Sequence, residues 1–334
     1  MFIGVDIGGT TTKFGIFSSK CELLEKWQVR TDLTEEGENI LPNIAKQIRK
    51  KMKERHLEIK SVKGIGIGIP GPVDDKGYVS KCVNLHWNHV PIPEQMSLYF
   101  PGCVIAAEND ANIAAFGEWK QGAGKGYRSM ILVTLGTGVG GGVILDNQIW
   151  SGAKGMAGEI GHISVNSEET KQCNCGGYGC VDQYASATGI VRKMYELLQT
   201  STKKSLLRQE IQLNAKVICD AAVEGDVLAN LCMEYCMGAL GKGLSYVSHI
   251  IDPEIYLIGG GVSKAGAIIL GYIEKEYRKH MHLGAQDKPI VSAKLGNDAG
   301  IIGAAYLAAE ERKGQYGQNT DIWRSDKTED KSRI

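Results

Sequence analysis

The spacing of apolar residues along the chain changes between the period of a strand and that of a helix. Short apolar or alternating runs, bounded by Gly, Pro or polar clusters, predict strands. The predicted strands are residues 2–6, 14–17, 23–30, 62–69, 103–107, 131–135, 143–145, 255–258 and 290–292. Longer segments with apolar residues every three or four positions predict helices. The predicted helices are residues 38–55, 111–119, 191–198, 264–281 and 299–311, with further helical segments in 213–250.

The order of these elements repeats. Each half reads as a strand, a glycine turn and further strands, then helix, strand and helix with variations, and the second half begins at residue 129. With 334 residues the chain is also too long for one ordinary core. We therefore expect two α/β domains built by internal duplication. Their topology is mixed, which differs from the strict strand–helix alternation of a Rossmann sheet.

Composition excludes several classes of protein. A hydrophobic content of 43% with 23% charged residues is typical of a soluble globular chain, and the formal net charge is zero. Bulk charge therefore predicts no nucleic-acid partner and no membrane partner. No apolar run approaches the ~20 residues of a membrane span, and the N-terminus has no signal-peptide layout. The nine cysteines are an odd number, and most are scattered, which favours reduced thiols and a cytoplasmic location.

A cluster of potential metal ligands lies near the middle of the chain. His162 precedes Cys173, Cys175 and Cys180, with glycines between them that let the backbone wrap tightly. One imidazole and three thiolates form a complete tetrahedral ligand set for Zn²⁺, and a closed four-ligand site is structural by default. The alternative is a set of unrelated buried thiols, since free Cys is often buried. The polar residues among these cysteines favour zinc.

Two glycine turns join predicted strands, one in each half. The first turn follows Asp6, and its backbone N–H groups and hydroxyls could cradle phosphates. Asp6 at its mouth could hold Mg²⁺ directly or through water. An ordinary hairpin with a capping Asp is the alternative for this stretch taken alone. The residues expected to bind ATP are Gly8, Gly9, Thr10, Thr11, Thr12 and Lys13 at the first turn, and Thr134, Gly136, Thr137 and Gly138 at the second.

Residues 66–71 and 136–141 match G-x-G-x-x-G by letter, but a dinucleotide fingerprint needs these glycines to open a helix. Pro70 and Pro72 prevent a helix after the first, and the second continues into a strand. A third run, Gly259, Gly260 and Gly261, leaves room for a base or ribose. The combination favours a hinge-bending phosphotransferase that closes on a nucleotide and disfavours a nicotinamide oxidoreductase.

Three further features allow two interpretations each. Asp110 lies between a strand and a helix, as either an N-cap or a general base at the carboxyl end of a strand. Asn84 and Trp87 lie in a predicted loop that either contacts a sugar or exposes a hydrophobic side chain. Glycines at 64, 66 and 68 allow another backbone or a ligand to approach one face of a strand.

These motifs resemble the ROK family of sugar kinases, most closely its Gram-positive-type glucokinases, over residues 2–311. Residues 6–10 are similar to the family's first phosphate motif, residues 135–138 to its second and residues 259–261 to its adenosine motif. Residues 109–112 match the segment that carries the catalytic Asp. Residues 158–162 with Cys-x-Cys-Gly-x-x-Gly-Cys match the family signature and zinc site, and residues 185–189 are similar to the glucokinase branch.

The resemblance implies the actin-like ATPase (ribonuclease H-like) α/β fold, with two duplicated domains and a cleft. We expect one domain at residues 1–117 plus 299–314, a larger one with the zinc site at 118–298, and a polar tail at 315–334. It also implies transfer of the γ-phosphoryl of ATP to the 6-hydroxyl of glucose or a related hexose, with Asp110 as base. By the same resemblance the sugar is held by Asn84, Asn109, Asp110, Glu159, His162 and Asp182. ATP, Mg²⁺ and Zn²⁺ are the expected cofactors, and the family suggests a homodimer or homotetramer.

Asp182 is a departure from the family, which usually has Glu at this position. Its side chain is one methylene shorter, so the preferred sugar is open: N-acetylglucosamine, N-acetylmannosamine and fructose kinases share the nucleotide motifs. A non-catalytic sugar sensor would lose the base or the phosphate turns, and this chain keeps both. The family's repressors carry an N-terminal helix-turn-helix, whereas this chain starts at the phosphate strand, which disfavours DNA binding.

Overall fold

The computed structural model describes residues 1–282 and 287–314 and divides the chain into two compact units. Unit 1 comprises Met1–Gly117 and the chain from Asp298 onward, and unit 2 comprises Glu118–Asn297. The chain thus crosses between the units twice. The polar tail expected at residues 315–334 lies outside the described residues.

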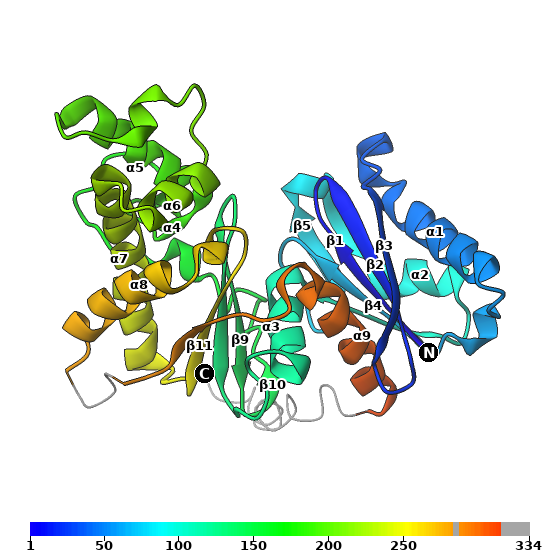
Figure 1. Ribbon diagram of the computed structural model, residues 1–334. Coiled ribbons are helices and arrows are strands. Elements are labelled where there is room, and N and C mark those ends of the chain that lie inside the picture. Colours follow the sequence, from blue (N-terminus) through cyan, green and yellow to red (C-terminus); the bar gives the residue numbers. More distant parts are fainter. Residues whose placement is uncertain (283–286, 315–334) are drawn as a thin grey trace, which may run out of the picture. The chain divides into compact units, whose positions relative to one another are not determined.

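Unit 1 is built on a five-stranded sheet of order β3-β2-β1-β4-β7 (Figure 1). The central strand β1 pairs antiparallel with β2, which pairs antiparallel with β3, while β4 and β7 run parallel to β1. The strands are β1 Phe2–Ile7, β2 Thr11–Phe17, β3 Leu23–Arg30, β4 Gly64–Ile69 and β7 Val104–Asn109. The carboxyl ends of β1, β4 and β7 therefore meet at one edge of the sheet.

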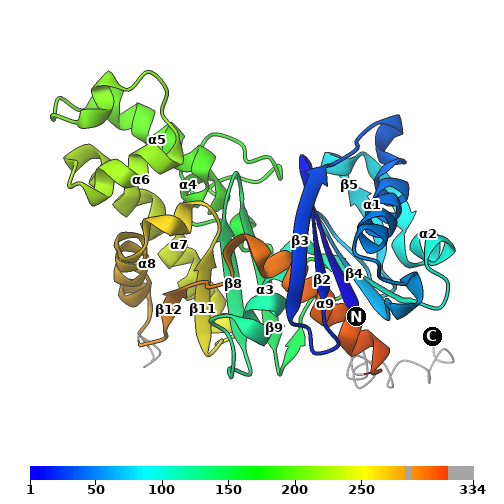
Figure 2. The same cartoon turned by 45° about the vertical axis from the view of Figure 1, so that its right-hand side comes forward.

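Helices cover both faces of this sheet (Figure 2). On one face, α1 (Ile40–Glu54) and α2 (Ile92–Tyr99) share a core with the Ile and Val residues of β1 and β4. On the other face lies α9 (Ala299–Arg312), so close that a Cβ on Gly4 or Gly66 would lie 1.9 or 1.8 Å from a helix carbonyl oxygen. The close approach expected along the glycines of 64–68 is therefore made by the backbone of α9 at Gly66 and by Ala308 of the same helix at Gly64, whereas Gly68 faces Ile113 and Asp110.

Unit 2 contains a second five-stranded sheet, of order β10-β9-β8-β11-β12. Its central strand β8 pairs antiparallel with β9 and parallel with β11, and β12 is parallel to β11. The strands are β8 Met130–Leu135, β9 Val139–Leu145, β10 Gln148–Ile149, β11 Ile255–Gly259 and β12 Ile290–Ser292. The strand order and directions match those of unit 1, which confirms the predicted duplication.

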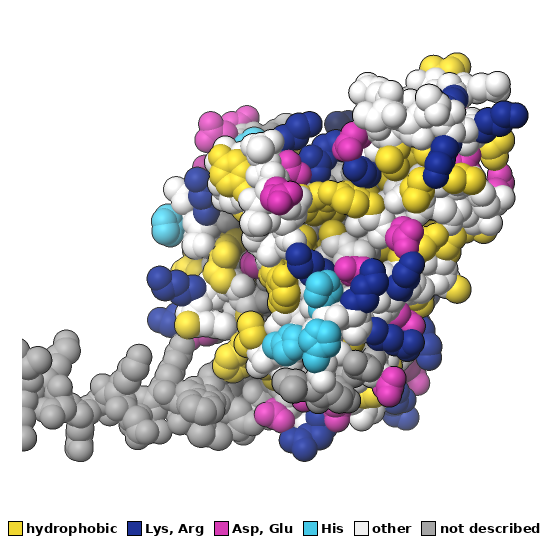
Figure 3. Space-filling view, turned by 90° about the vertical axis from the view of Figure 1, so that its left-hand side faces the viewer, with side chains coloured by type: hydrophobic (Ala, Val, Ile, Leu, Met, Phe, Trp, Pro, Cys, Tyr) yellow, Lys and Arg dark blue, Asp and Glu magenta, His cyan; other side chains and the backbone are white. Residues whose placement is uncertain are grey.

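The helices of unit 2 pack around α7, which contacts α4, α5, α6 and α8. They are α4 Asp182–Ala185, α5 Ala187–Thr200, α6 Ala215–Val223, α7 Val227–Ile250 and α8 Ala267–His280. Figure 3 shows a face of this unit on which basic, acidic, histidine and hydrophobic side chains are intermixed. Within residues 1–282 and 287–314, no helix is long and apolar enough to cross a membrane.

Several local predictions needed correction. The helical segments predicted in 213–250 are two helices, α6 and α7, which are separated at Gly225 with φ +90°; the Asp226 side chain caps α7 by accepting from Ala229 N at 2.9 Å. The helix after the third glycine run begins at Ala267, behind a 3-10 turn at Val262–Ala265. The short elements β5, β6, α2, β10 and α4 were not predicted, because such brief segments show no clear period.

The stretch 84–87 also differs from the prediction. It consists of a 3-10 turn, Val83–Leu85, and the start of β6 (Trp87–Pro91), which pairs with β5 (Tyr78–Cys82). Trp87 is only 5% exposed, and its Nε1 donates to Gly37 O at 2.9 Å. The interpretation of Trp87 as a surface hydrophobic residue is therefore wrong, since its ring belongs to the core of unit 1.

Candidate active site and metal centre

The first turn (residues 8–10) lies at the carboxyl edge of the unit 1 sheet. Gly8 N donates to Thr11 O at 3.0 Å and closes the hairpin between β1 and β2. Thr31, the residue after β3, supports this turn: its hydroxyl donates to Gly8 O at 2.6 Å and its N–H to Thr10 O at 2.9 Å. Sequence reasoning missed Thr31, because nothing in a lone threonine after a strand marks it as a support for a distant turn.

The three hydroxyls expected at this tip do not all face outward. Thr12 is 2% exposed, and its hydroxyl lies 3.0 Å from that of Thr31. Thr10 is exposed and Thr11 is half-buried. Thr12 therefore stabilises the turn from inside, and only the other two hydroxyls remain accessible at the tip.

Asp6 is held at the end of β1 by two neighbours. Lys13 Nζ lies 3.2 Å from Asp6 Oδ2, and the Asp6 side chain is 18% exposed. A Cβ on Gly300, at the start of α9, would lie 2.7 Å from the Asp6 carboxyl carbon, so only glycine leaves room for the carboxylate. The carboxylate fits a cation site, although a metal ion beside it would share it with the Lys13 ammonium.

Asp110 is the first residue of α3 (Asp110–Gln121), directly after β7. Asn109 Oδ1 accepts from Ala111 N at 2.9 Å and from Asn112 N at 3.1 Å, so Asn109 caps the helix. Asp110 Oδ1 also accepts from Ala111 N, at 2.8 Å. Asn109 Nδ2 donates to Gly71 O at 3.1 Å, which ties the start of α3 to the loop after β4. Both ends of the Asn109 amide are therefore already engaged within unit 1.

The sheet brings the remaining predicted residues of unit 1 together. Asp6 pairs in register with Gly68, and Ile69 pairs with Asn109, so Asp6 and Asp110 lie at the same edge. A Cβ on Gly9 would lie 3.8 Å from Asn84 Cβ, which places Asn84 against the first turn. Unit 1 thus gathers a carboxylate, an amide and a glycine turn at one edge of its sheet.

The second turn (residues 136–138) occupies the matching edge in unit 2. Gly136 N donates to Gly138 O at 2.9 Å, and β9 continues from Val139 as a strand, which confirms that this glycine run does not open a helix. The third glycine run lies beside it, since Gly259 pairs in register with Thr134. Gly260 has φ +88°, and a Cβ there would lie 2.4 Å from Leu135 O. Only glycine fits at this position.

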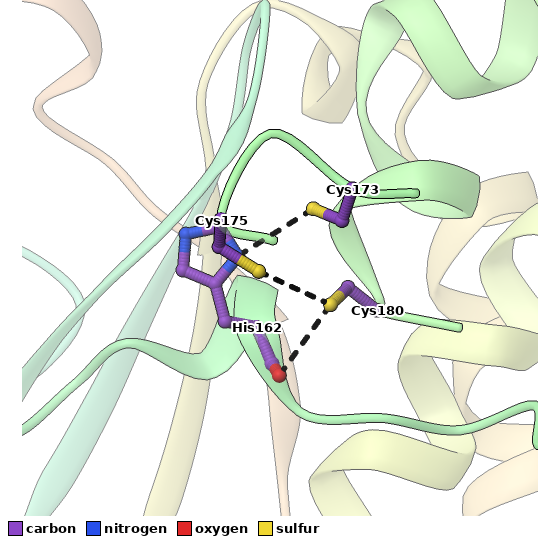
Figure 4. Close-up of side chains that lie close together, drawn as sticks. All are labelled: His162, Cys173, Cys175 and Cys180. Carbon is purple, nitrogen blue, oxygen red and sulfur yellow. Dashed lines mark hydrogen bonds between the residues drawn. The ribbon is translucent and has the colours of Figure 1, made fainter. Parts of the chain in front are cut away.

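The four predicted metal ligands converge in unit 2 (Figure 4). All donor atoms of His162, Cys173, Cys175 and Cys180 lie within 4.8 Å of one another. The Sγ atoms of Cys175 and Cys180 are 3.6 Å apart, and Cys173 Sγ is 3.8 Å from His162 Nδ1. A tetrahedral Zn²⁺ with Zn–S bonds of about 2.3 Å would place two sulfurs about 3.8 Å apart. The donor set and its spacing therefore fit zinc.

The metal loop (residues 159–182) lies along β9 and closes on itself. Gly161 packs so tightly that a Cβ there would lie 2.2 Å from Val139 O, and Gly141 faces Gly158 in the same way. The two arms of the loop pair with each other: Val181 N donates to Ile163 O at 3.0 Å, and Val165 N donates to Gly179 O at 2.8 Å. This pairing brings the imidazole of His162 to the cysteines.

The two ring nitrogens of His162 face different partners. Nδ1 faces Cys173, whereas Nε2 lies 3.8 Å from Glu159 Oε2. The histidine is the last residue of a 3-10 turn, Ile160–His162, and Glu159 directly precedes that turn. A metal ion on Nδ1 would leave Nε2 directed toward Glu159.

Electrostatics at the cysteines also favours a cation. The N–H of Gly177 lowers the pKa of Cys175, while burial and the neighbouring thiols raise the pKa of Cys180 to about 12. Three thiols this close cannot all ionise without a compensating charge, and metal binding requires thiolates. A divalent cation would supply that charge at the centre of the cluster.

A polar network that sequence reasoning missed supports the metal loop. Tyr184 OH donates to Glu169 Oε2 at 3.0 Å and accepts from Asn166 Nδ2 at 3.0 Å. Arg192 lies 3.4 Å from the same Glu169 oxygen and also donates to Gln183 O at 2.8 Å. Burial opposes ionisation of Glu169, but the Lys171 N–H, Tyr184 and Arg192 outweigh it and lower its pKa. These groups fasten the segment between His162 and Cys173 to α4 and α5.

The predicted sugar residues are divided between the units. Asn84, Asn109 and Asp110 belong to unit 1, and Glu159, His162 and Asp182 belong to unit 2. Asp182 is engaged within unit 2, because its Oδ1 accepts from Val139 N at 2.7 Å. Its contact with a sugar stays a prediction.

Known proteins share this architecture. Residues 2–311 match the model of the ROK family. A glucokinase of Halalkalibacterium halodurans is 38% identical, with 96% of this chain and 98% of the relative covered. An N-acetyl-D-glucosamine kinase of Haemophilus influenzae is 30% identical over 92% of this chain and 99% of its own. The solved ROK glucokinase of Streptomyces griseus, in complex with glucose and AMPPNP, has a TM-score of 0.76 and 34% identity, with 92% of this chain and 99% of that chain covered.

These similarities extend over nearly the whole chain and agree with the duplicated sheets. The fold is the actin-like ATPase fold of ROK sugar kinases. The match to the family model and the identity to full-length relatives lead to one conclusion. The chain belongs to the ROK family.

Proposed function

We propose that this chain is an ATP-dependent glucokinase that transfers the γ-phosphoryl group of ATP to the 6-hydroxyl of glucose. The observation that carries the proposal is the edge of the unit 1 sheet, where Asp110, Asn84 and the first turn lie together. A carboxylate beside a phosphate-binding turn is what a phosphotransferase needs to activate a hydroxyl. The glucokinase relatives at 34–38% identity support glucose as the sugar.

In this mechanism Asp110 accepts the proton of the sugar 6-hydroxyl as its oxygen attacks the γ-phosphorus. The bond between the γ-phosphorus and the bridging oxygen breaks, and ADP leaves. Phosphoryl transfer depends mainly on positioning and on stabilisation of charge. Backbone N–H groups of the first and second turns donate to the phosphate oxygens as charge develops there. Gly261 has open space beside it, and the adenosine is proposed to bind there next to the second turn, while Gly260 packs against the Leu135 backbone.

The proposed metals have separate tasks. Mg²⁺, when bound beside Asp6, neutralises phosphate charge, and Lys13 adds a second positive group there. Zn²⁺, when bound by His162, Cys173, Cys175 and Cys180, holds the metal loop in shape. The imidazole then presents its other nitrogen toward Glu159. These two side chains are proposed to contact sugar hydroxyls along with Asn84 and Asn109.

N-acetylglucosamine kinase is the second candidate, because the Haemophilus influenzae relative with that name is 30% identical over its full length. N-acetylmannosamine and fructose are the other sugars that the shared nucleotide motifs permit. A non-catalytic sensor ranks last, since this chain keeps Asp110 and both turns. A homodimer or homotetramer, and a cytoplasmic location, remain predictions.

The test is a coupled assay with Mg·ATP against glucose, N-acetylglucosamine, N-acetylmannosamine, mannose and fructose. Turnover of glucose well above the others is the expected result. A higher rate with an acetylated sugar or fructose would move the chain to another branch and leave the role of Asp110 intact. Glucose binding without turnover of any sugar would favour the sensor.

A further inference from the structure

Asp182 and Val139, the residue that follows the second turn, are 43 residues apart in sequence and in direct contact in the structure. Oδ1 of Asp182 accepts from the backbone N–H of Val139, the first residue of β9, at 2.7 Å. The same oxygen lies 2.9 Å from where a Cβ on Gly138 would be, so the carboxylate rests against the turn itself. We propose that Asp182 is a positioning residue for the second turn, which it holds in the conformation that binds nucleotide phosphates.

This role rests on the proposed function, because it takes the ligand of the second turn to be the phosphates of ATP. It replaces the sugar contact that sequence suggested for Asp182 with a contact inside the nucleotide machinery. The carboxylate accepts a hydrogen bond at the point where the turn becomes a strand. A charged acceptor makes this bond stronger than a neutral one would.

The segment that follows Asp182 makes further contacts with the turn. Ala187 N donates to Gly136 O at 2.8 Å, and the Thr188 hydroxyl donates to Thr137 O at 3.2 Å. Together with the bond from Val139 N to Asp182, residues 182–188 make three hydrogen bonds to the backbone of residues 136–139. The tip nevertheless stays accessible, because Thr137 and Gly138 are exposed. A turn held from behind and open in front is suited to present its N–H groups to a ligand.

Asp182 also connects the turn to the metal loop. Cys180, a candidate zinc ligand, is two residues away, and its N–H donates at 3.1 Å to Oε1 of Gln183, which lies in the same short helix as Asp182. The other arm of the loop reaches the same strand, since Gly161 packs on Val139 O. Val139 is thus contacted by both arms, one of which ends in His162 and the other in Cys180. Loss of the metal is therefore expected to weaken nucleotide binding as well as sugar binding.

The experiment compares Asp182→Ala and Asp182→Asn with wild type in two separate calorimetric titrations, one with Mg·AMPPNP and one with glucose. Removal of a charged hydrogen-bond acceptor in Asp182→Ala is expected to weaken Mg·AMPPNP binding about 10- to 100-fold. Glucose affinity should change by less than about twofold. Asp182→Asn keeps an oxygen that can accept from Val139 N, so it should recover most of the affinity for Mg·AMPPNP.

Asp226→Ala is the matched control. It removes another Asp of unit 2 whose side chain accepts a backbone N–H, from Ala229 at 2.9 Å, at the start of α7. We expect it to lower the melting temperature and leave Mg·AMPPNP affinity unchanged. If Asp182→Ala does not fold, Thr188→Ala removes a neighbouring contact to the same turn and should weaken Mg·AMPPNP binding in the same direction.

A fall in glucose affinity with unchanged Mg·AMPPNP affinity in Asp182→Ala would overturn the proposal and make Asp182 a sugar ligand. An equal fall in both ligands and in zinc content would also overturn it, since that pattern indicates a purely structural role. Failure of the proposed function gives a different result. The wild-type protein would then phosphorylate none of the five sugars, while the titration with Mg·AMPPNP would still measure the effect of Asp182. A wild-type protein that does not bind Mg·AMPPNP would refute both.

Discussion

The two units share one strand order but support their glycine turns in different ways. In unit 1 the edge strand β3 is Leu23–Arg30, and the next residue, Thr31, bonds Gly8 O and Thr10 O from its own sheet. In unit 2 the edge strand β10 is only Gln148–Ile149, and the second turn is held by residues 182–188. That segment directly follows the candidate zinc ligands.

Because of this difference, the two equivalent turns should depend on different parts of the chain for their conformation. The first turn depends on the strand that precedes Thr31, so it should remain intact when the metal loop is disturbed. The second turn is contacted by a loop whose three cysteines bind a metal ion as thiolates, and these would repel one another without a cation. By the proposals above, the chemistry belongs to unit 1, and nucleotide binding at the second turn of unit 2 is expected to depend on a metal ion. The predictions below test this division, from the largest expected effect to the smallest.

The largest effect is expected from Asp110→Asn in unit 1. Loss of a general base should lower kcat by about 10²–10⁴-fold. Glucose affinity should be retained, because the amide has nearly the same shape. Steady-state kinetics and calorimetry with glucose check both parts. Asp74→Asn, which alters a carboxylate in another turn of unit 1, is the control. Near-normal turnover of Asp110→Asn would refute the assignment.

Cys175→Ser tests the dependence of unit 2 on metal. It removes one of four donors, so zinc content should fall from about one ion per chain to well below half. Glucose and Mg·AMPPNP affinities should both fall, since the metal loop contacts the second turn. Atomic absorption and calorimetry measure these quantities. Cys103→Ser, at a half-buried thiol outside the cluster, should keep the zinc. A fully active Cys175→Ser variant with full zinc content would contradict the site.

Gly260→Ala and Gly261→Ala form a matched pair beside the second turn. Gly260 has φ +88°, and a Cβ there would meet the Leu135 backbone, so the methyl group should destabilise the protein by about 1–3 kcal/mol or more. Gly261 has φ −64° and open space around it, so its substitution should be tolerated. Urea unfolding compares the two. Equal stability of both variants would show that the close contact at Gly260 is not as described.

Thr31→Val removes the support of the first turn with little change in shape. The Gly8 carbonyl and the buried Thr12 hydroxyl lose a partner, which should cost about 1–3 kcal/mol of folding free energy. Mg·AMPPNP affinity should fall while zinc content stays the same, in contrast to Cys175→Ser. Thr34→Val, at an exposed threonine nearby, is the control. Loss of zinc in Thr31→Val would break the proposed independence of the two turns.

The smallest effect concerns Glu169, whose pKa is lowered in the folded protein. A carboxylate with a lowered pKa stabilises the fold fully above its ordinary value of 4.5, and this contribution is lost as the pH falls through the lowered pKa. Glu169→Gln should therefore be less stable than wild type at pH 7, and the difference should shrink below pH 4.5. Melting temperatures at pH 7, 5 and 4 measure this, with Glu168→Gln as the control. A difference that does not change with pH would exclude the linkage.

Most of the main-sheet strands and longer helices could be read from the pattern of apolar residues. Leu23–Arg30 and Ile290–Ser292 have the predicted bounds, because their runs are clearly delimited. The hairpin of β5 and β6 could not be predicted, since it belongs to neither main sheet and its residues show no simple alternation. Trp87 is buried because β6 pairs with β5 and places the indole against Gly37, a contact across 50 residues.

The site was also predicted only in part, because local spacing reveals some of its residues and tertiary packing decides the others. Covalent spacing confines His162, Cys173, Cys175 and Cys180 to one loop, and glycines that interrupt apolar runs mark the turns, so both can be read in sequence order. Which side chain supports which turn depends on strand register and on the packing of inserted segments. Thr31, the Tyr184–Glu169–Arg192 network and the contact of Asp182 with Val139 are therefore visible only in the folded chain.

The sequence by itself determined the repeated order of strands and helices, the candidate metal-ligand set and the positions of the glycine turns. These depend on local periodicity, on backbone freedom at glycine and on short covalent spacing. Tertiary structure alone decided that α9 lies on the glycines of β1 and β4, that Gly260 packs against Leu135, and that Asp182 holds the second turn. Each of these is a close contact between residues far apart in the chain, and such contacts arise only when the sheets and helices pack together.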